Sequence, residues 1–285
     1  MSKIQFTKMH GLGNDYIYID AIKNKDLKEI FTRYSLGALV RYLSDRHFGI
    51  GGDGVIFLDS STVADFKMRI FNSDGTEAEM CGNGIRAFAK YIYDNSLAEG
   101  EILKIETLAG IKEIKREKYL TGINNEEIDE YVVNMGQPKV WGKTELEISD
   151  NKIETINISI GNPHAVIFVE NVDNIQIDKI GPIIENYKYF PQKTNVEFVQ
   201  ILDKNLIKVR VWERGSGETL ACGTGSCAAV IAGVTNNLTK RKVKVLLQGG
   251  ELEIDWNEQD NNVYMKGIAT KVFQRCRMLR KRIMR

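Results

Sequence analysis

The sequence contains few of the residues that build metal centres and disulfide frameworks. It has four cysteines and three histidines among 285 residues, and no Cys-x-x-Cys pair. Structural zinc sites usually need four such ligands at short spacing, so we expect no bound metal. A disulfide framework is typical of short, cysteine-rich secreted chains, and this composition instead favours free thiols in a reducing compartment.

Long apolar runs and a charge excess are also missing. No run approaches the roughly 20 apolar residues that a membrane-spanning helix needs. The segment Met1–Phe6 lacks the apolar stretch of a signal peptide, so we expect a cytoplasmic protein. The net charge of +1 gives no electrostatic reason to expect a nucleic acid or a membrane as partner.

What the sequence does contain is an internal duplication. Arg69–Gly84 (RIFNSDGTEAEMCGNG) aligns without a gap with Arg210–Gly225 (RVWERGSGETLACGTG). The period of about 140 residues is domain-sized and excludes a solenoid of short repeats. Alternating strand-like segments, with one prominent helix after each cysteine motif, predict two similar α/β halves. We expect the first half at residues 1–128, the second at 129–270, and a final strand end and basic tail at 271–285 that return to the first half.

The duplication places Cys81 and Cys222 at equivalent positions. Each heads a Cys-Gly-x-Gly turn that is followed by a helix-like segment, Ile85–Tyr93 or Ser226–Ala232. Glycines let a ligand approach the backbone, and the positive end of a helix favours both a bound carboxylate and a thiolate. The pattern predicts that one thiol acts from each side of a substrate held between the two halves. Cys227 lies in an Ala-rich run and is interpreted as a core residue.

The glycine turns also match the spelling of dinucleotide-binding loops, which is a weak signal. A nucleotide fold needs a strand that leads directly into the glycines, whereas the strand-like segments at Arg69 and Arg210 end several residues earlier. A third match at Gly49–Gly54 is followed by the strand-like Val55–Leu58, and no P-loop motif is present. We therefore do not expect a nucleotide site.

Polar residues accompany the glycines at positions that suit amino-acid binding. Asn14, Asn162 and Asn195 border apolar, strand-like runs, where an amide could fix an ammonium or carboxylate group. Arg214 could grip a carboxylate through two parallel hydrogen bonds, and Glu213 could accept an ammonium group. The sequence thus predicts a small zwitterionic substrate.

With these features the chain resembles the diaminopimelate epimerases, pyridoxal-independent enzymes of lysine and peptidoglycan-precursor synthesis. The resemblance runs from about Ile4 to Phe273 and includes several motifs in the same order. They are Met9–Asp15, Asp45–Gly54, Met80–Arg86, Ile160–His164, Thr194–Asn195, Trp212–Thr219 and Ala221–Gly225.

The resemblance implies an α+β fold of two pseudo-symmetric domains, each a curved, mostly antiparallel sheet or barrel around a central helix, with the active site in the cleft between them. It implies that Cys81 and Cys222 are an acid/base pair, tuned by His164 and Glu213, and that the reaction needs no cofactor. It further implies a homodimer and a diaminopimelate substrate. The implied substrate-binding residues are Asn14, Asn72, Gly82, Asn83, Asn162, Asn195, Glu213, Arg214, Gly223 and Thr224.

Two parts of the chain depart from the family pattern. Some members carry Gln where this chain has Gly54, so Gly54 is left out of the expected site. The basic segment Arg275–Arg285 lies outside the resemblance, and we expect a solvated, mobile terminus there.

Other functions stay open at this point. A racemase of another amino acid, related to proline racemase, would share the two thiols, although such enzymes usually carry His where this chain has Asn83. A noncatalytic amino-acid-binding protein could use the same scaffold, but the loss of a cysteine would be expected. A thiol redox protein would instead place two cysteines in one motif.

Overall fold

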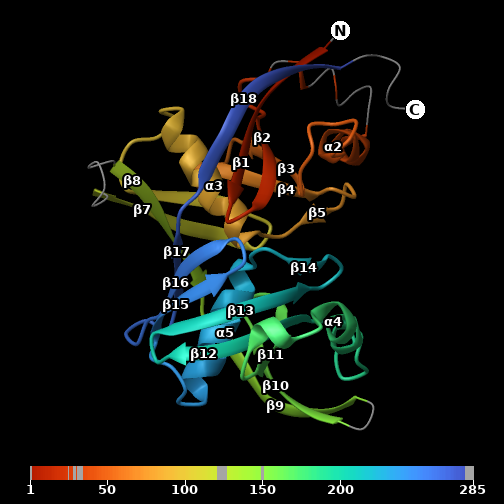
Figure 1. Ribbon diagram of the computed structural model, residues 1–285. Coiled ribbons are helices and arrows are strands. Elements are labelled where there is room, and N and C mark those ends of the chain that lie inside the picture. Colours follow the sequence, from red (N-terminus) through yellow and green to blue (C-terminus); the bar gives the residue numbers. More distant parts are fainter. Residues whose placement is uncertain are drawn as a thin grey trace. The chain divides into compact units, whose positions relative to one another are not determined.

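Each cysteine motif belongs to its own compact unit. The computed structural model describes residues 2–24, 26–27, 30, 35–120, 127–148 and 151–279, and Figure 1 colours the chain along its length. One unit comprises the chain up to Val133 together with the chain from Ile268 onward, and the other is Asn134–Gly267. The sequence analysis placed the boundaries after residues 128 and 270, whereas the units of the structure divide after Val133 and Gly267.

The first unit is built on a mostly antiparallel sheet. Its strands pair in the order β18–β1–β2–β3–β4–β6–β7–β8, with β5 added to β4, and the pairs β2–β3 and β4–β6 are parallel. The elements are β1 (Ser2–Gly11), β2 (Asn14–Asp20), α2 (Leu36–Ser44), β3 (Gly54–Asp59), β4 (Phe66–Asn72), β5 (Glu77–Ala78), α3 (Gly82–Asp94), β6 (Ile102–Thr107), β7 (Gly110–Leu120), β8 (Glu127–Gly136) and β18 (Thr270–Leu279).

The second unit repeats this topology strand for strand. Its order is β9–β10–β11–β12–β13–β15–β16–β17, with β14 added to β13, and the pairs β11–β12 and β13–β15 are parallel. The elements are β9 (Lys139–Ile148), β10 (Asn151–Ser159), β11 (Pro163–Phe168), the short 3₁₀ helix η1 (Val172–Asn174), α4 (Ile177–Glu185), β12 (Asn195–Asp203), β13 (Leu206–Glu213), β14 (Gly217–Thr219), α5 (Gly223–Thr235), β15 (Lys242–Leu247), β16 (Gly250–Trp256) and β17 (Val263–Gly267).

The two units obtain their outermost strand from different parts of the chain. In the second unit, β9 directly precedes its partner β10. In the first unit the equivalent strand is β18, which pairs with β1 from Ser2 opposite Leu279 to His10 opposite Thr270. The ribbon in Figure 1 shows β18 running alongside β1. The last described strand therefore completes the sheet of the first unit.

For Arg275–Leu279 this pairing corrects the expectation of a mobile basic terminus. Residues Arg275–Leu279 lie in β18, and the remainder of the tail falls outside the described residues. Arg277 donates to the carbonyl oxygens of Gly49 and Phe48, at 2.9 and 2.7 Å, and to the hydroxyl of Tyr42. Because strand side chains alternate between the two faces, a basic segment can pair its backbone and still place its charges at the surface.

The central helices α3 and α5 are buried. Helix α3 packs against β1, β2, β3 and β18, and α5 packs against β10 to β13, β16 and β17. The stretch Gly225–Gly233 of α5 is buried throughout, as expected for a helix that is apolar on all sides. Both helices begin earlier than the predicted segments at Ile85 and Ser226, because the glycines form their first turn.

Two further helices were not anticipated from the sequence. Helix α2 buries Leu39, Val40 and Leu43 in a cluster with strand residues that include Ile17 and Val55. Helix α4 covers the corresponding face of the second sheet, through Ile177 and Ile184. Across the part of the chain described, no helix is both long and apolar enough to span a membrane.

Substitution of Phe88 measures how much the packing of helix α3 contributes to the stability of the fold. The Phe88 side chain is fully buried in α3, whereas that of Phe48 is 77% exposed. We expect Phe88→Ala to lower the free energy of unfolding by about 3–5 kcal/mol, because it removes a buried ring and leaves a cavity. Phe48→Ala should change it by less than about 0.5 kcal/mol. Urea unfolding of both variants measures this difference, and equal losses would contradict it.

Candidate active site

Both cysteines cap the central helix of their unit. Cys81 and Cys222 are the N-cap residues of α3 and α5, with extended backbone angles. The sulfur of Cys81 accepts a hydrogen bond from the Gly84 N–H at 3.3 Å, and that of Cys222 accepts one from the Gly225 N–H at 3.4 Å. The first turn of a helix has N–H groups without partners inside the helix, and here a sulfur atom accepts one of them. Each thiol therefore lies at the positive end of a helix dipole.

Different side chains lie at equivalent positions beside the two sulfurs. In the parallel pair β2–β3, Tyr16 lies opposite Gly54, and Ile56 follows two residues later. In the parallel pair β11–β12 the corresponding residues are His164, Asn195 and Glu197. The glycines of the helices confirm this correspondence. A Cβ on Gly84 would lie 2.9 Å from Cδ1 of Ile56, and a Cβ on Gly225 would lie 2.7 Å from Oε1 of Glu197.

Cys81 faces an asparagine that presents its oxygen. The thiol donates to Oδ1 of Asn14 at 3.3 Å. The other end of that amide, Nδ2, donates to Oδ2 of Asp53 at 2.8 Å. Because a carboxylate oxygen can only accept, Asp53 fixes which end of the Asn14 amide faces the sulfur. Burial raises the pKa of Tyr16 well above its usual value, and the nearby Cys81 raises it further.

A charged network holds Asp53 in place. Arg46 donates to Oδ1 of Asp15 at 2.7 Å and to Oδ1 of Asp53 at 2.8 Å. Lys8 pairs with Asp15 and donates to the carbonyl of Gly51. Burial acts to raise the pKa of Asp15, but hydrogen bonds from Arg46 and Lys8 outweigh it and hold that pKa below its usual value. Burial raises the pKa of Asp53. The Asp45–Gly54 motif thus connects, through Asn14, to the first thiol.

Cys222 lies in a more enclosed and more acidic setting. Its thiol is 3.5 Å from the hydroxyl of Thr224. Burial raises the pKa of Cys222 well above its usual value, and the charges of Glu213 and Glu197 add to this, while Thr224 and Gly225 act in the opposite direction. Glu213 accepts from the Thr219 hydroxyl at 2.6 Å, and burial raises its pKa as well. Glu213 therefore lies beside the second thiol.

His164 lies between two polar partners. Its Nδ1 is 2.7 Å from Oε1 of Glu197, and its Nε2 is 2.9 Å from Oδ1 of Asn162. Nδ2 of Asn162 donates to Oγ1 of Thr224 at 3.3 Å. The predicted residues Asn162, His164 and Thr224 are therefore joined into one chain that reaches Cys222. Both ring nitrogens of His164 are engaged by partners other than a thiol, so its predicted influence on a thiol would pass through these neighbours.

The side chain of Asn195 binds the main chain of Arg214. The Asn195 amide donates to the carbonyl of Pro163 at 2.9 Å and accepts from the Arg214 N–H at 2.9 Å. The Arg214 guanidinium donates to the carbonyl of Gln192. The loop that follows is anchored by Glu185, which accepts from the Gly215 N–H at 3.1 Å. Asn195 thus braces the Arg214 loop in this structure.

The remaining predicted residues lie in or near the first turns of the central helices, or at the end of β4. Asn83 is buried at the start of α3, and its Oδ1 accepts from Arg86 at 2.9 Å. Asn72 is exposed at the end of β4 and donates to the Thr76 hydroxyl at 3.1 Å. Gly82 and Gly223 form the first residue of α3 and α5.

Gly54 is fixed by its surroundings. A Cβ at this position would lie 2.0 Å from the carbonyl oxygen of Phe71 and 2.9 Å from the Tyr16 ring. No side chain fits there on this backbone.

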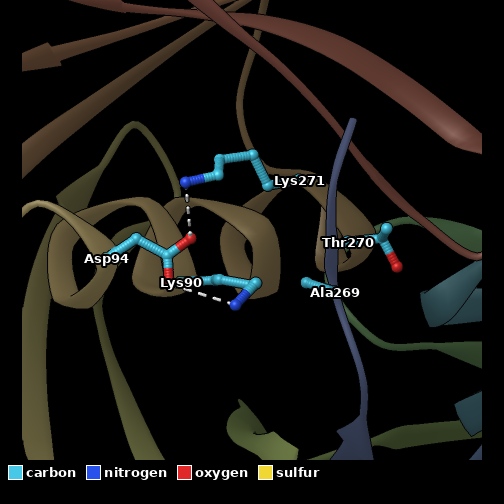
Figure 2. Close-up of a pocket in the computed structure, with 5 residues that line it drawn as sticks. All are labelled: Lys90, Asp94, Ala269, Thr270 and Lys271. Carbon is cyan, nitrogen blue, oxygen red and sulfur yellow. Dashed lines mark hydrogen bonds and ion pairs between the residues drawn. The ribbon is translucent and has the colours of Figure 1, made fainter. Parts of the chain in front are cut away.

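A shallow groove elsewhere in the first unit contains none of the predicted residues. Its volume is about 530 Å³, and it is lined by Lys90, Asp94, Ala269, Thr270 and Lys271 (Figure 2). Asp94 pairs with Lys90 at 3.1 Å and with Lys271 at 3.8 Å. These charges neutralise one another in part, and the groove offers no chemistry beyond surface ion pairs.

Sequence reasoning missed Glu197, Asp53 and Arg46. Glu197 stands in the apolar run Asn195–Ile201, and a charged residue in a buried strand needs a partner. That signal was available in the sequence. The partner could not be identified, because His164 becomes its neighbour only when β11 and β12 pair.

A matched pair of glycine substitutions tests the difference between the two thiol settings. In Gly225→Ala the new methyl group would displace Oε1 of Glu197, which is held by His164, whereas in Gly84→Ala it would meet the movable end of Ile56. We expect Gly225→Ala to lower the free energy of unfolding by about 1–3 kcal/mol, and Gly84→Ala by less. Denaturant unfolding gives both values, and a larger loss in Gly84→Ala would contradict this assignment.

Known proteins resemble this chain over nearly its whole length. The family model for diaminopimelate epimerase matches residues 6–141 and 156–272. A diaminopimelate epimerase from Methanococcus maripaludis strain C6 is 47% identical over 284 residues, which cover 95% of this chain and 98% of the relative. One from Acetivibrio thermocellus is 45% identical over 284 residues, covering 95% of this chain and 97% of the relative.

Solved structures of lower identity share the fold. A phenazine biosynthesis protein from Bacillus anthracis superposes with a TM-score of 0.72 at 18% identity, covering 98% of this chain and 100% of that one. A hydroxyproline epimerase from Agrobacterium vitis does so with a TM-score of 0.68 at 13% identity, covering 96% and 92%. These likenesses confirm the α+β architecture, and the sequence relatives add the family. The chain belongs to the diaminopimelate epimerase family.

Proposed function

We propose that this protein inverts one α-carbon of LL-2,6-diaminopimelate to give the meso isomer, in lysine and peptidoglycan-precursor biosynthesis. The observation that carries the proposal is the pair of N-cap cysteines at equivalent positions of two repeated units. Membership of the family supports the same isomerase activity and substrate. The protein is thus an epimerase.

The proposed chemistry uses the two thiols as acid and base. A thiolate removes the α-proton, and the other thiol returns a proton to the opposite face, so that the centre is inverted. Both sulfurs must then reach one α-carbon. A positioned proton-transfer group contributes roughly 10²–10⁴-fold to rate.

The charge that forms on the reacting carbon and carboxylate needs stabilisation. The N–H groups at Gly82–Asn83 and Gly223–Thr224 lie in the first turns of α3 and α5. Oriented N–H donors of this kind stabilise developing negative charge without reorganisation during the reaction. We assign the reacting carboxylate to them.

The remaining residues are assigned to substrate binding. Arg214 provides a guanidinium on a loop that Asn195 and Glu185 hold in place. Glu213 provides a carboxylate beside Cys222, and Asn14, Asn72 and Asn162 provide amide groups. A substrate with two amino-acid ends needs both signs of charge in its pocket, and this set supplies them.

An exchange experiment tests the function. Reduced protein is incubated in deuterated water with LL-diaminopimelate, proline or glutamate, and α-deuterium incorporation and stereochemistry are followed by NMR. We expect exchange with inversion for diaminopimelate alone. Cys81→Ala and Cys222→Ala should each lower the inversion rate by at least about 10²-fold. Cys276→Ala, which alters an exposed cysteine of β18, serves as the control.

Each other outcome points to a different function. Inversion of proline in place of diaminopimelate would indicate a racemase of the proline type. Tight binding of diaminopimelate without exchange in the fully reduced protein would indicate a noncatalytic binding protein, and the epimerase assignment would then be wrong.

The assembly state and location follow from the family resemblance. We propose a cytoplasmic homodimer, in line with what the resemblance implies. Sedimentation equilibrium should give a mass near twice the 32.3 kDa of one chain. A single species at the mass of one chain, unchanged at rising concentration, would contradict the dimer.

A further inference from the structure

A buried carboxylate lies at the far end of the polar chain that reaches Cys222. The side chains of Glu197 and His164 are both 0% exposed, and Oε1 of Glu197 lies 2.7 Å from Nδ1 of His164. The second oxygen, Oε2, is buried and has no hydrogen-bond partner among the residues that the structure describes. A buried carboxylate is costly unless an opposite charge compensates it, so the state of His164 is decisive.

Both partners of His164 offer an oxygen to the ring. Nδ1 faces a carboxylate oxygen of Glu197, and Nε2 faces the amide oxygen of Asn162 at 2.9 Å. A ring that carries a proton on each nitrogen can donate to both of these oxygens. In that state the imidazolium and the Glu197 carboxylate form a buried ion pair with no net charge.

This ion pair sets the direction of the bonds that follow. Because Oδ1 of Asn162 accepts from the ring, Nδ2 of the same amide is left to donate to Oγ1 of Thr224, at 3.3 Å. The Thr224 oxygen then accepts, and its hydrogen is available to the sulfur of Cys222, 3.5 Å away. Thr224 and the Gly225 N–H together supply two donors to an ionised Cys222.

The equivalent thiol of the first unit has different partners. Asp53 accepts from Nδ2 of Asn14, so Oδ1 of Asn14 faces Cys81 and accepts from its S–H group. The Cys81 sulfur also accepts from the Gly84 N–H and is hydrogen-bonded to Tyr16. The position of Glu197 is occupied in the first unit by Ile56, which carries no charge.

We propose that Glu197 keeps His164 doubly protonated and so acts as a positioning residue. It fixes the direction of the hydrogen-bond chain through His164, Asn162 and Thr224, so that the chain ends in a donor to Cys222. In the first unit Tyr16 and the uncharged Ile56 occupy the positions of His164 and Glu197, so this control applies to Cys222 and not to Cys81.

Other charged groups face the two sulfurs and must be kept constant in a test. Glu213 on β13, Glu197 on β12 and His164 on β11 surround Cys222. On the other side, Cys81 influences Tyr16 and Tyr18 of β2, Arg86 lies on the same helix, and Asp53 acts through Asn14. A substitution of Glu197 leaves all of these except the His164 charge in place.

The decisive variant is Glu197→Gln, which has the same size and no charge. Without the carboxylate, His164 holds one proton, on Nδ1, and its Nε2 becomes an acceptor. The Asn162 amide then turns over and presents its oxygen to Thr224, whose hydroxyl donates to it and no longer to Cys222.

The readout is the pH dependence of alkylation by iodoacetamide, resolved for each cysteine by peptide mass spectrometry, in the full chain without substrate. Since only the thiolate reacts, we expect the midpoint for Cys222 to rise by about one pH unit in Glu197→Gln, the effect of losing one hydrogen bond to a charged group. The midpoint for Cys81, measured in the same sample, should not move. Glu253→Gln, which alters a surface ion pair with Lys242 in the same unit, should move neither midpoint.

A fall of the Cys222 midpoint in Glu197→Gln would show that Glu197 acts only as a nearby negative charge, and an unchanged midpoint would show no coupling. Either result overturns the proposal.

Variants at Thr224 test the last link of the chain and remain informative if Glu197→Gln does not fold. Thr224→Val removes the hydroxyl and should raise the Cys222 midpoint by a similar amount, whereas Thr224→Ser should keep it. In the Thr224→Val background, Glu197→Gln should add nothing further. An unchanged midpoint in Thr224→Val, or additive shifts in the double variant, would refute the chain. Because no substrate is present, these results do not depend on the exchange assay that tests the proposed function.

Discussion

The structure of each unit depends on how its buried central helix begins. The first turn of a helix has N–H groups without partners, and burying them unsatisfied would be costly. In α3 and α5 a cysteine sulfur accepts one of these N–H groups, and glycines in the next positions allow the close approach of the surrounding strands. The same contact that caps the start of the helix therefore holds a reactive sulfur at the positive end of the helix dipole.

Duplication repeated this arrangement, but the residues around the sulfurs diverged. The strand pairings place Ile56 and Tyr16 in one unit where Glu197 and His164 lie in the other. These substitutions preserve the backbone topology, because they change only side chains beneath the helix N-terminus. They alter the charge and the hydrogen-bond partners at each thiol.

Much of this arrangement could be predicted because it depends on local sequence. The aligned Cys-Gly-x-Gly segments predicted both capped helices, and the alternating apolar residues predicted several strands. Helices α2 and α4 were missed, since their amphipathic segments are short and lie outside the repeated motifs. Residues Arg275–Leu279 were misinterpreted as part of a mobile terminus because their strand partner, β1, lies at the other end of the chain. Asp53 and Arg46 were recognised only as parts of a motif, because their link to Asn14 spans about forty positions of sequence.

The sequence by itself determined the duplication, the two cysteines, their position at the start of a helix, and the family to which the chain belongs. These features are carried by residue identity and short spacing. Only the tertiary structure decided which atoms face each sulfur. Glu197 meets His164 because β11 and β12 pair in one register, and Asp53 meets Asn14 because β2 and β3 pair in parallel with Tyr16 opposite Gly54. The polarity of a hydrogen bond depends on partners brought together from distant positions, and no local pattern records them.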